Sequence, residues 1–183
     1  MGLLQPDKYV SRITQIDIKW DLVRKGLTCV LLDMDNTIVS RETHEVPYDV
    51  MQWLAKAQQA GISFCILSNN WHQSAYEWGI KLGFPVVAKA CKPLVHGYAL
   101  AARKLNTQKE HMVMVGDQLF TDILGAKLYG ISAIMVGPLS EIDLKHTLAI
   151  RQIEYAVMNK RQNKEREVFG DEESVHAINP RDF

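Results

Sequence analysis

The sequence predicts an α/β fold in which a parallel β-sheet is covered by helices on both faces. Short apolar runs alternate with amphipathic segments through most of the chain, which is the pattern of strand–helix–strand units. Several runs are apolar throughout, as strands buried on both faces are. Of the 183 residues, 47% are hydrophobic and 23% are charged, so we expect a compact domain and not a disordered chain.

Five apolar runs are expected to form the strands of this sheet. None of them is long enough to span a membrane, which takes about 20 residues. The runs are residues 28–32, 62–67, 86–87, 112–116 and 131–136. Parallel pairing is expected because the segments between the runs are long enough for crossover helices.

The four segments between these runs show the spacing of helices. Pro47 is expected to open the first helix and Gly61 to end it, since proline is favoured in the first turn and glycine just after the last. The second helix ends at Gly83, the third starts at Pro93, and the fourth ends at Gly130. The inner faces expected for the first three are Val50, Trp53, Leu54 and Ala57; Trp71, Ala75, Trp78 and Leu82; and Tyr98, Ala101, Ala102 and Leu105.

The two ends of the chain carry weaker signals. Residues 1–27 contain a polar, partly amphipathic stretch with weak periodicity, and the first strand is expected only after it. From 141 to about 167 a long helix is expected, with a basic run at Lys160–Arg166, and a loosely held tail follows. We therefore expect a single domain over residues 1–183, with its core at about 28–137.

Charge and cysteine content narrow the classes of function. Lys+Arg and Asp+Glu each total 21, so no overall basic field attracts nucleic acid. Cys29, Cys65 and Cys91 form no paired motif, which favours reduced thiols in an intracellular protein. The amino terminus lacks the apolar core of a signal peptide, so we expect a cytoplasmic protein, with peripheral membrane contact left open.

Polar residues follow the ends of the predicted strands, where ligands bind in parallel sheets. They are Asp33, Asp35, Ser68, Lys92, Asp117 and Asp122. Single Asp residues often cap helices or fill turns. Asp33 and Asp35, however, stand two residues apart beside a buried strand, and their carboxylates repel each other unless a cation or a proton intervenes. The set favours a metal-assisted phosphoryl-transfer site.

Four motifs resemble the signature of the haloacid dehalogenase (HAD) superfamily of phosphatases. Asp33–Thr37 matches its DxDxT motif, Ser68 its second motif, Lys92 its third, and Gly116–Asp122 its fourth, in the form GDxxxTD. The match covers about residues 28–137. Within subfamily IIIA, the segments LLDMDNTIV, ILSNN, KP and GDQLFTDILGAK are similar to those of the YqeG family, which is related to phosphatidylglycerophosphate phosphatases.

The resemblance implies a three-layer, Rossmann-like HAD fold and Mg²⁺-dependent hydrolysis of phosphomonoesters. Asp33 would be the nucleophile that forms an aspartyl-phosphate, and Asp35 would act as acid and then as base. Asp33, the backbone carbonyl of Asp35, and Asp117 would hold Mg²⁺.

The other motif residues are implied to bind or position the phosphate. Ser68, Asn69 and Lys92 would contact the transferring phosphoryl group. Asp122 would orient Lys92 or a metal-bound water, and Thr37 would support the backbone.

The spacing of the motifs leaves no room for a large cap domain. The intervals 33–68 and 68–92 are filled by the helices and strands that continue the sheet. An open site accepts a large or lipid-linked phosphate, or it is completed by a second copy of the chain in a homo-oligomer. The loop 40–46 is the expected flap, and its Arg41 and His44 are candidates for substrate contact.

Two other classes of protein are alternatives to a phosphatase. A response-regulator receiver shares the architecture, but its phosphoacceptor follows the third strand, whereas here both acids belong to one motif after the first predicted strand. The alternative to an enzyme is an interaction protein that keeps the scaffold and binds RNA or a ribosome-assembly partner.

Overall fold

The structure, a computed structural model, describes residues 2–70 and 73–140. The helix and tail expected beyond residue 140 lie outside the described residues, as does Trp71. The described residues form a six-stranded sheet in which all neighbouring strands are parallel. The α/β fold expected from the sequence is confirmed.

The strands follow the order β1–β6–β5–β2–β3–β4 across the sheet. Their bounds are β1 Lys8–Val10, β2 Cys29–Leu32, β3 Ser63–Leu67, β4 Val86–Val87, β5 Met112–Gly116 and β6 Ser132–Val136. The central strands β2 and β5 are buried along their whole length, which explains why their sequences are apolar without alternation.

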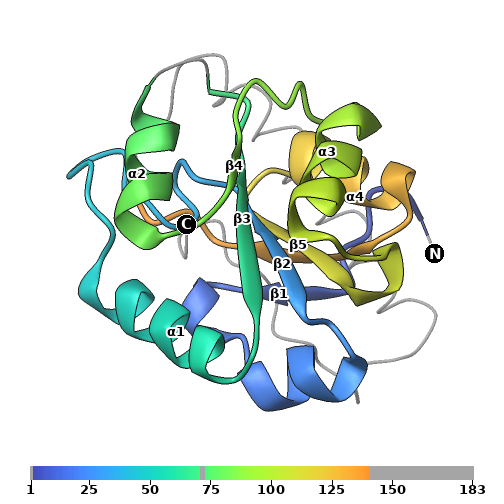
Figure 1. Cartoon of the computed structure of the whole chain (residues 1–183), viewed down its shortest axis with the longest axis horizontal. Helices are drawn as coiled ribbons and strands as arrows, with labels where there is room; N and C mark the ends of the chain where they lie inside the picture. Colours follow the sequence, from blue (N-terminus) through green and yellow to red (C-terminus); the bar gives the residue numbers. More distant parts are fainter. Residues whose placement is uncertain (1, 71–72, 141–183) are drawn as a thin grey trace, which may run out of the picture. The chain divides into compact units, whose positions relative to one another are not determined.

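Helices cover both faces of the sheet. The α-helices of the described part are α1 Tyr48–Gln59, α2 Ser74–Leu82, α3 Val95–Leu105 and α4 Leu124–Tyr129. Figure 1 shows α1 and α2 on one side of the sheet and α3 and α4 on the other. A π-helical segment over Leu119–Ile123 leads into α4. The glycines expected to end the second and fourth helices, Gly83 and Gly130, both adopt the left-handed conformation that glycine tolerates best.

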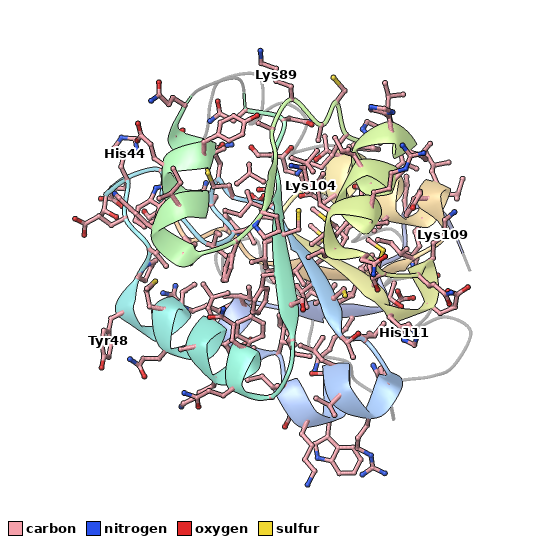
Figure 2. The ribbon with its side chains drawn as sticks, in the orientation of Figure 1. His44, Tyr48, Lys89, Lys104, Lys109 and His111 are labelled. Atoms are coloured by element: carbon pink, nitrogen blue, oxygen red, sulfur yellow. The ribbon has the colours of Figure 1, made fainter. Side chains whose placement is uncertain are left out.

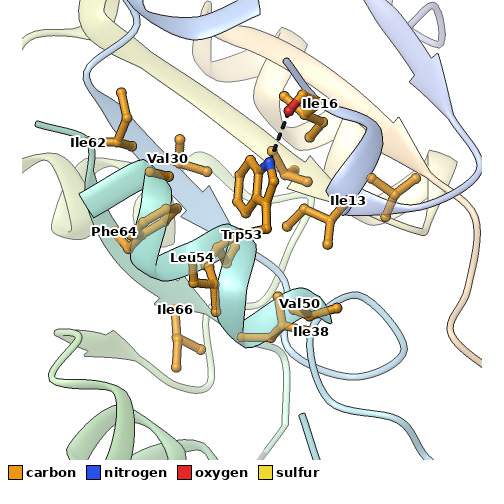
Figure 3. Packing of buried hydrophobic residues seen from close by; sticks show 14 of the residues in the cluster. Ile13, Ile16, Val30, Ile38, Val50, Trp53, Leu54, Ile62, Phe64 and Ile66 are labelled. Carbon is orange, nitrogen blue, oxygen red and sulfur yellow. Dashed lines mark hydrogen bonds between the residues drawn. The ribbon is translucent and has the colours of Figure 1, made fainter. Parts of the chain in front are cut away.

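Trp53 anchors the core between α1 and the sheet (Figure 3). Its Nε1–H donates a hydrogen bond to the backbone oxygen of Ile16 at 2.9 Å, and its ring centroid lies 6.0 Å from that of Phe64 on β3. All four residues expected on the inner face of α1 are buried. The contact with Ile16 makes the amino-terminal stretch part of the packed fold.

The prediction that residues 1–27 contain no strand is wrong. Lys8–Val10 forms the edge strand β1 beside β6. Asp7 reinforces this pairing, because its Oδ2 accepts from the N–H of Ala133 at 2.7 Å and its Oδ1 accepts from Lys127 Nζ at 2.6 Å. A strand of three residues with one buried side chain leaves no periodic pattern, so tertiary pairing decides its conformation.

The carboxyl ends of β2, β3 and β5 meet at one edge of the sheet. In the parallel register, Leu32 aligns with Ile66 of β3 and with Val115 of β5. The polar residues that follow these three strands are therefore brought to the same edge, as expected from the sequence.

Candidate active site

The two acids of the first motif lie at the carboxyl end of β2. Asp33 is buried, and its N–H continues the pairing with β5 by donating to the backbone oxygen of Val115 at 2.9 Å. Asp35 is half-buried. The next residue, Asn36, has a left-handed φ of 62°, and its N–H donates to the backbone oxygen of Val39 at 2.8 Å. The backbone therefore turns directly after Asp35, which keeps both acids at the edge of the sheet.

Lys92 places a buried ammonium between two carboxylates. Its Nζ lies 2.5 Å from Asp33 Oδ1 and 2.7 Å from Asp122 Oδ1, and its side chain is 2% exposed. Burial would lower the pKa of Lys92, but the charges of Asp122 and Asp33 outweigh burial and raise it. Lys92 therefore carries a positive charge at neutral pH.

Asn69 holds the backbone of Lys92. Its Oδ1 accepts from the N–H of Lys92 at 2.6 Å, and its Nδ2 donates to the backbone oxygen of Lys92 at 3.0 Å. The side-chain amide thus fixes the segment that carries the ammonium, which the sequence did not indicate. The phosphate contact expected for Asn69 stays a prediction.

Asp122 is held in place on the π-helical segment. Its Oδ2 accepts from the N–H of Gln118 at 3.1 Å, and the hydroxyl of buried Tyr98 donates to the backbone oxygen of Asp122, also at 3.1 Å. Gly116 permits the close approach of this side chain, since a Cβ at that position would come within 2.2 Å of Asp122 Oδ2. The glycine of the GDxxxTD motif is therefore required by the position of its last aspartate.

Three buried carboxylates come together beside Lys92. One oxygen from each of Asp33, Asp117 and Asp122 lies within 4.8 Å of the others. Burial raises the pKa of Asp122, and the negative charges of Asp33 and Asp117 raise it further. The positive charge of Lys92 lowers this pKa but does not outweigh burial. Clustered carboxylate oxygens are the donors that a hard cation such as Mg²⁺ prefers, so the residues present fit that ion.

Ser68 and Asn70 contribute the neighbouring wall of the site. Ser68 is buried, and its Oγ accepts from the N–H of Asn70 at 3.0 Å. Asn70 Nδ2 in turn donates to Asp35 Oδ2 at 3.2 Å. Burial raises the pKa of Asp35, and the charge of Asp33 adds to this, whereas Arg41 and Asn70 oppose it. Asp35 therefore stays protonated to a higher pH than an ordinary aspartate.

These side chains line a small cleft of about 60 Å³. The lining residues are Asp33, Asp35, Arg41, Ser68, Asn69, Asn70, Lys92, Gln118 and Thr121. Two wider grooves of about 490 and 570 Å³ on the described surface are lined by none of these residues. Because the titratable groups converge in the small cleft, we take it as the candidate active site.

The structure brings the residues predicted from the sequence into or beside this cleft. Thr37 is buried with its Oγ1 3.5 Å from Asp33 Oδ2, and Asp117 and Asp122 are fully buried. His44, a candidate for substrate contact, is exposed at the surface (Figure 2). It is not among the residues that line the cleft.

Sequence reasoning missed Asn70, Gln118 and Thr121 as cleft residues. Asn70 directly follows Ser68 and Asn69 at the end of β3, and this position is the signal that marks it. Gln118 and Thr121 lie inside the fourth motif, between its two aspartates. Their side chains join each other through a hydrogen bond of 3.1 Å from Thr121 Oγ1 to Gln118 Oε1.

Comparison with known proteins finds similar chains and similar folds. The chain is 30% identical over 159 residues to "Probable phosphatase YqeG" of Bacillus subtilis, an alignment that covers 87% of this chain and 92% of that protein. A crystal structure of an uncharacterized protein from Listeria monocytogenes serotype 4b shares the fold, with a TM-score of 0.52, 24% identity, and coverage of 64% of this chain and 85% of that one. Residues 13–130, more than half of the chain, match the family model of the haloacid dehalogenase-like hydrolases, and the protein belongs to that family.

Proposed function

We propose that this phosphatase hydrolyses phosphomonoesters in two steps through an aspartyl-phosphate on Asp33, with Mg²⁺ as its cofactor. The observation that carries the proposal is the position of Asp33 in the cleft. One of its oxygens lies 2.5 Å from the ammonium of Lys92, and Asp35 and Ser68 line the same cleft. A nucleophile, a proton donor and groups that bind a phosphoryl oxygen thus share one small space.

In the first step, a carboxylate oxygen of Asp33 attacks phosphorus, and the bond from phosphorus to the leaving oxygen breaks. Asp35 donates its proton to that oxygen, so the alcohol leaves neutral. The raised pKa of Asp35, due first to burial and then to the charge of Asp33, favours the protonated form that this step needs. Lys92 and the hydroxyl of Ser68 bind the oxygens of the phosphoryl group during its transfer.

In the second step, ionised Asp35 takes a proton from a water molecule whose oxygen attacks phosphorus. The bond between Asp33 and phosphorus breaks, inorganic phosphate leaves, and both aspartates return to their starting protonation states. Asn70 orients Asp35 throughout by its hydrogen bond of 3.2 Å to Asp35 Oδ2.

Asp33, Asp117 and the backbone carbonyl of Asp35 would hold the Mg²⁺ ion. Support comes from the three carboxylates that meet within 4.8 Å of one another, because a single ammonium does not balance three such charges. When bound, the ion supplies the positive charge that lets a carboxylate and an anionic phosphate approach each other. Asp122 orients Lys92 through their contact of 2.7 Å.

The size of the cleft bears on the substrate. A volume of about 60 Å³ has room for little more than a phosphoryl group, so the alcohol stays outside. The elements of the described chain include no cap domain over it. This openness supports a large or lipid-linked phosphate, such as phosphatidylglycerophosphate, or completion of the site by a second copy of the chain.

A substrate at a membrane surface would need a peripheral contact. Leu3, which is 53% exposed, is an apolar side chain near the amino terminus that could serve this contact. The basic run expected to assist it, Lys160–Arg166, lies outside the described residues. Among the helices of the described residues, none is long and apolar enough to cross a membrane.

The test is phosphate release from a panel of lipid, sugar and nucleotide monoesters in the presence of Mg²⁺. Asp33→Asn is expected to release no phosphate, and Asp35→Asn is expected to lose at least about 100-fold in kcat. Asp49→Asn removes a carboxylate from the exposed start of α1 and is the control that keeps wild-type turnover. Wild-type turnover by Asp33→Asn would contradict the proposed mechanism.

A further inference from the structure

We propose that Arg41 recognises a second anionic group on the substrate, carried by the alcohol that leaves. The inference rests on the proposed function, because it takes Asp35 as the group that protonates the leaving oxygen. The substrate class is then the phosphomonoesters of acidic alcohols, in which a carboxylate or a phosphodiester stands a few bonds from the phosphate.

Arg41 lines the candidate cleft from the loop 40–46. This loop is closed on itself, since the N–H of Ser40 donates to the backbone oxygen of Glu45 at 2.9 Å. The N–H of Arg41 donates to Asn36 Oδ1 at 3.3 Å, which ties the loop to the first motif. The backbone of Arg41 is therefore already positioned, so ligand binding has only its side chain left to order.

The two cationic side chains that line the cleft lie at different carboxylates. Lys92 pairs with Asp33 at 2.5 Å, on the side that receives the phosphoryl group. Arg41 lines the same cleft as Asp35, and its N–H donates to the side chain of Asn36, the residue that follows Asp35. Since Asp35 meets the leaving oxygen in the proposed mechanism, Arg41 belongs to the leaving-group side of the cleft.

A guanidinium in this position discriminates between leaving groups. An anionic group beside it accepts charge-assisted and bidentate hydrogen bonds, which a neutral alcohol cannot do. A second negative charge would otherwise be repelled by the carboxylate of Asp33, so Arg41 also removes a penalty that acidic alcohols would meet.

The test compares matched phosphomonoesters as competitive inhibitors of p-nitrophenyl phosphate hydrolysis. 3-Phosphoglycerate and glycerol 3-phosphate share a three-carbon skeleton, and they differ in having a carboxylate or a hydroxymethyl group. Wild type is expected to bind the carboxylate ester about tenfold more tightly or better, the value of one charge-assisted contact. Arg41→Gln is expected to abolish this preference, and Arg41→Lys to keep part of it.

A second pair identifies the source of the anion. Phosphatidylglycerophosphate and phosphatidic acid in phosphatidylcholine vesicles are both lipid monoesters, but only the first carries a phosphodiester on its leaving group. If the preference for phosphatidylglycerophosphate over phosphatidic acid depends on Arg41, the anion belongs to a lipid headgroup. If only the preference for 3-phosphoglycerate over glycerol 3-phosphate depends on Arg41, the anion belongs to a soluble acid. Either result supports the role of Arg41.

Lys56→Gln removes the same charge from the exposed side of α1 and is expected to leave the preference intact. The inference is overturned if Arg41→Gln weakens both members of each pair equally, or if wild type shows no preference in either pair. If wild type does not hydrolyse p-nitrophenyl phosphate with any divalent cation, the proposed function itself fails.

Discussion

Replacing Asp122 by Asn tests how the buried charges of the site are balanced. The substitution removes a carboxylate but keeps the shape of the side chain, and an amide oxygen can still accept from the N–H of Gln118. Lys92 keeps Asp33 as a carboxylate partner at 2.5 Å. We expect the ammonium to be drawn to Asp33 and to occupy the oxygen that attacks phosphorus.

Two opposing effects of similar size act on the stability of this variant. Lys92 Nζ lies 2.7 Å from Asp122 Oδ1, an attraction of about 6 kcal/mol at an effective dielectric constant of about 20. Oxygens of Asp33 and Asp117 lie within 4.8 Å of one of Asp122, and on the same basis each repels it by at least about 3.5 kcal/mol. These contributions nearly cancel, so the free energy of unfolding is expected to change by no more than about 1 kcal/mol.

Chemical denaturation in the presence of chelator and steady-state kinetics with Mg²⁺ check this prediction together. We expect kcat of Asp122→Asn to fall by about 10- to 100-fold with little change in KM, because the nucleophile is affected more than substrate binding. Asp49→Asn, which removes a surface carboxylate on α1, is expected to keep the wild-type kcat. A loss of more than about 3 kcal/mol in stability with kcat unchanged would refute the reasoning, because Asp122 would then be a purely structural partner of Lys92.

Two further predictions concern the metal and the pH dependence of stability. Chelation of divalent cations is expected to stop phosphate release, and added Mg²⁺ is expected to restore it. Ca²⁺ should restore it poorly, because Ca²⁺ accepts more ligands in a looser geometry. Full phosphate release in excess chelator would count against Asp33 and Asp117 as metal ligands. Burial would raise the pKa of Asp21, but hydrogen bonds from Lys8 and from the N–H of Asp17 outweigh it and lower the pKa. The stabilisation that ionised Asp21 contributes is therefore complete above the ordinary aspartate pKa of about 4, and it is lost as pH falls through the lower pKa of the folded protein. Asp21→Asn should lower the free energy of unfolding by about 1 kcal/mol at pH 7 and by less in acid. An equal loss at both pH values, measured by chemical denaturation, would contradict this prediction.

The central strands could be predicted because burial on both faces leaves a local pattern in the sequence. Cys29–Leu32 and Met112–Gly116 are apolar at every position up to the terminal glycine, and the structure buries all of them. The edge strand Lys8–Val10 could not be predicted in the same way. It is held by pairing with β6 and by the hydrogen bonds of Asp7 to Ala133 and Lys127, and partners so far along the chain leave no local signal.

The sequence predicts which residues form the site better than it predicts the hydrogen bonds between them. Parallel register brings the carboxyl ends of β2, β3 and β5 together, so residues that follow these strands lie close together for any conformation of the loops. The bonds from Asn69 to the backbone of Lys92 and from Asn70 to Asp35 depend on how distant loops pack, which no spacing rule encodes. The same holds for Arg41, whose place on the cleft follows from how its loop is tied to Asn36.

Detection of a phosphorylated Asp33 during turnover tests the central claim most directly. p-Nitrophenyl phosphate suits this experiment, because its leaving group needs little protonation, so Asp35→Asn should slow the release of phosphate from Asp33 more than its transfer to Asp33. Rapid acid quench, proteolysis and mass spectrometry are predicted to find the phosphoryl group on the peptide that contains Asp33, and to find more of it in Asp35→Asn than in wild type. Phosphate release by wild type with no phosphorylated Asp33 in either protein would contradict the account and would point to direct attack by water.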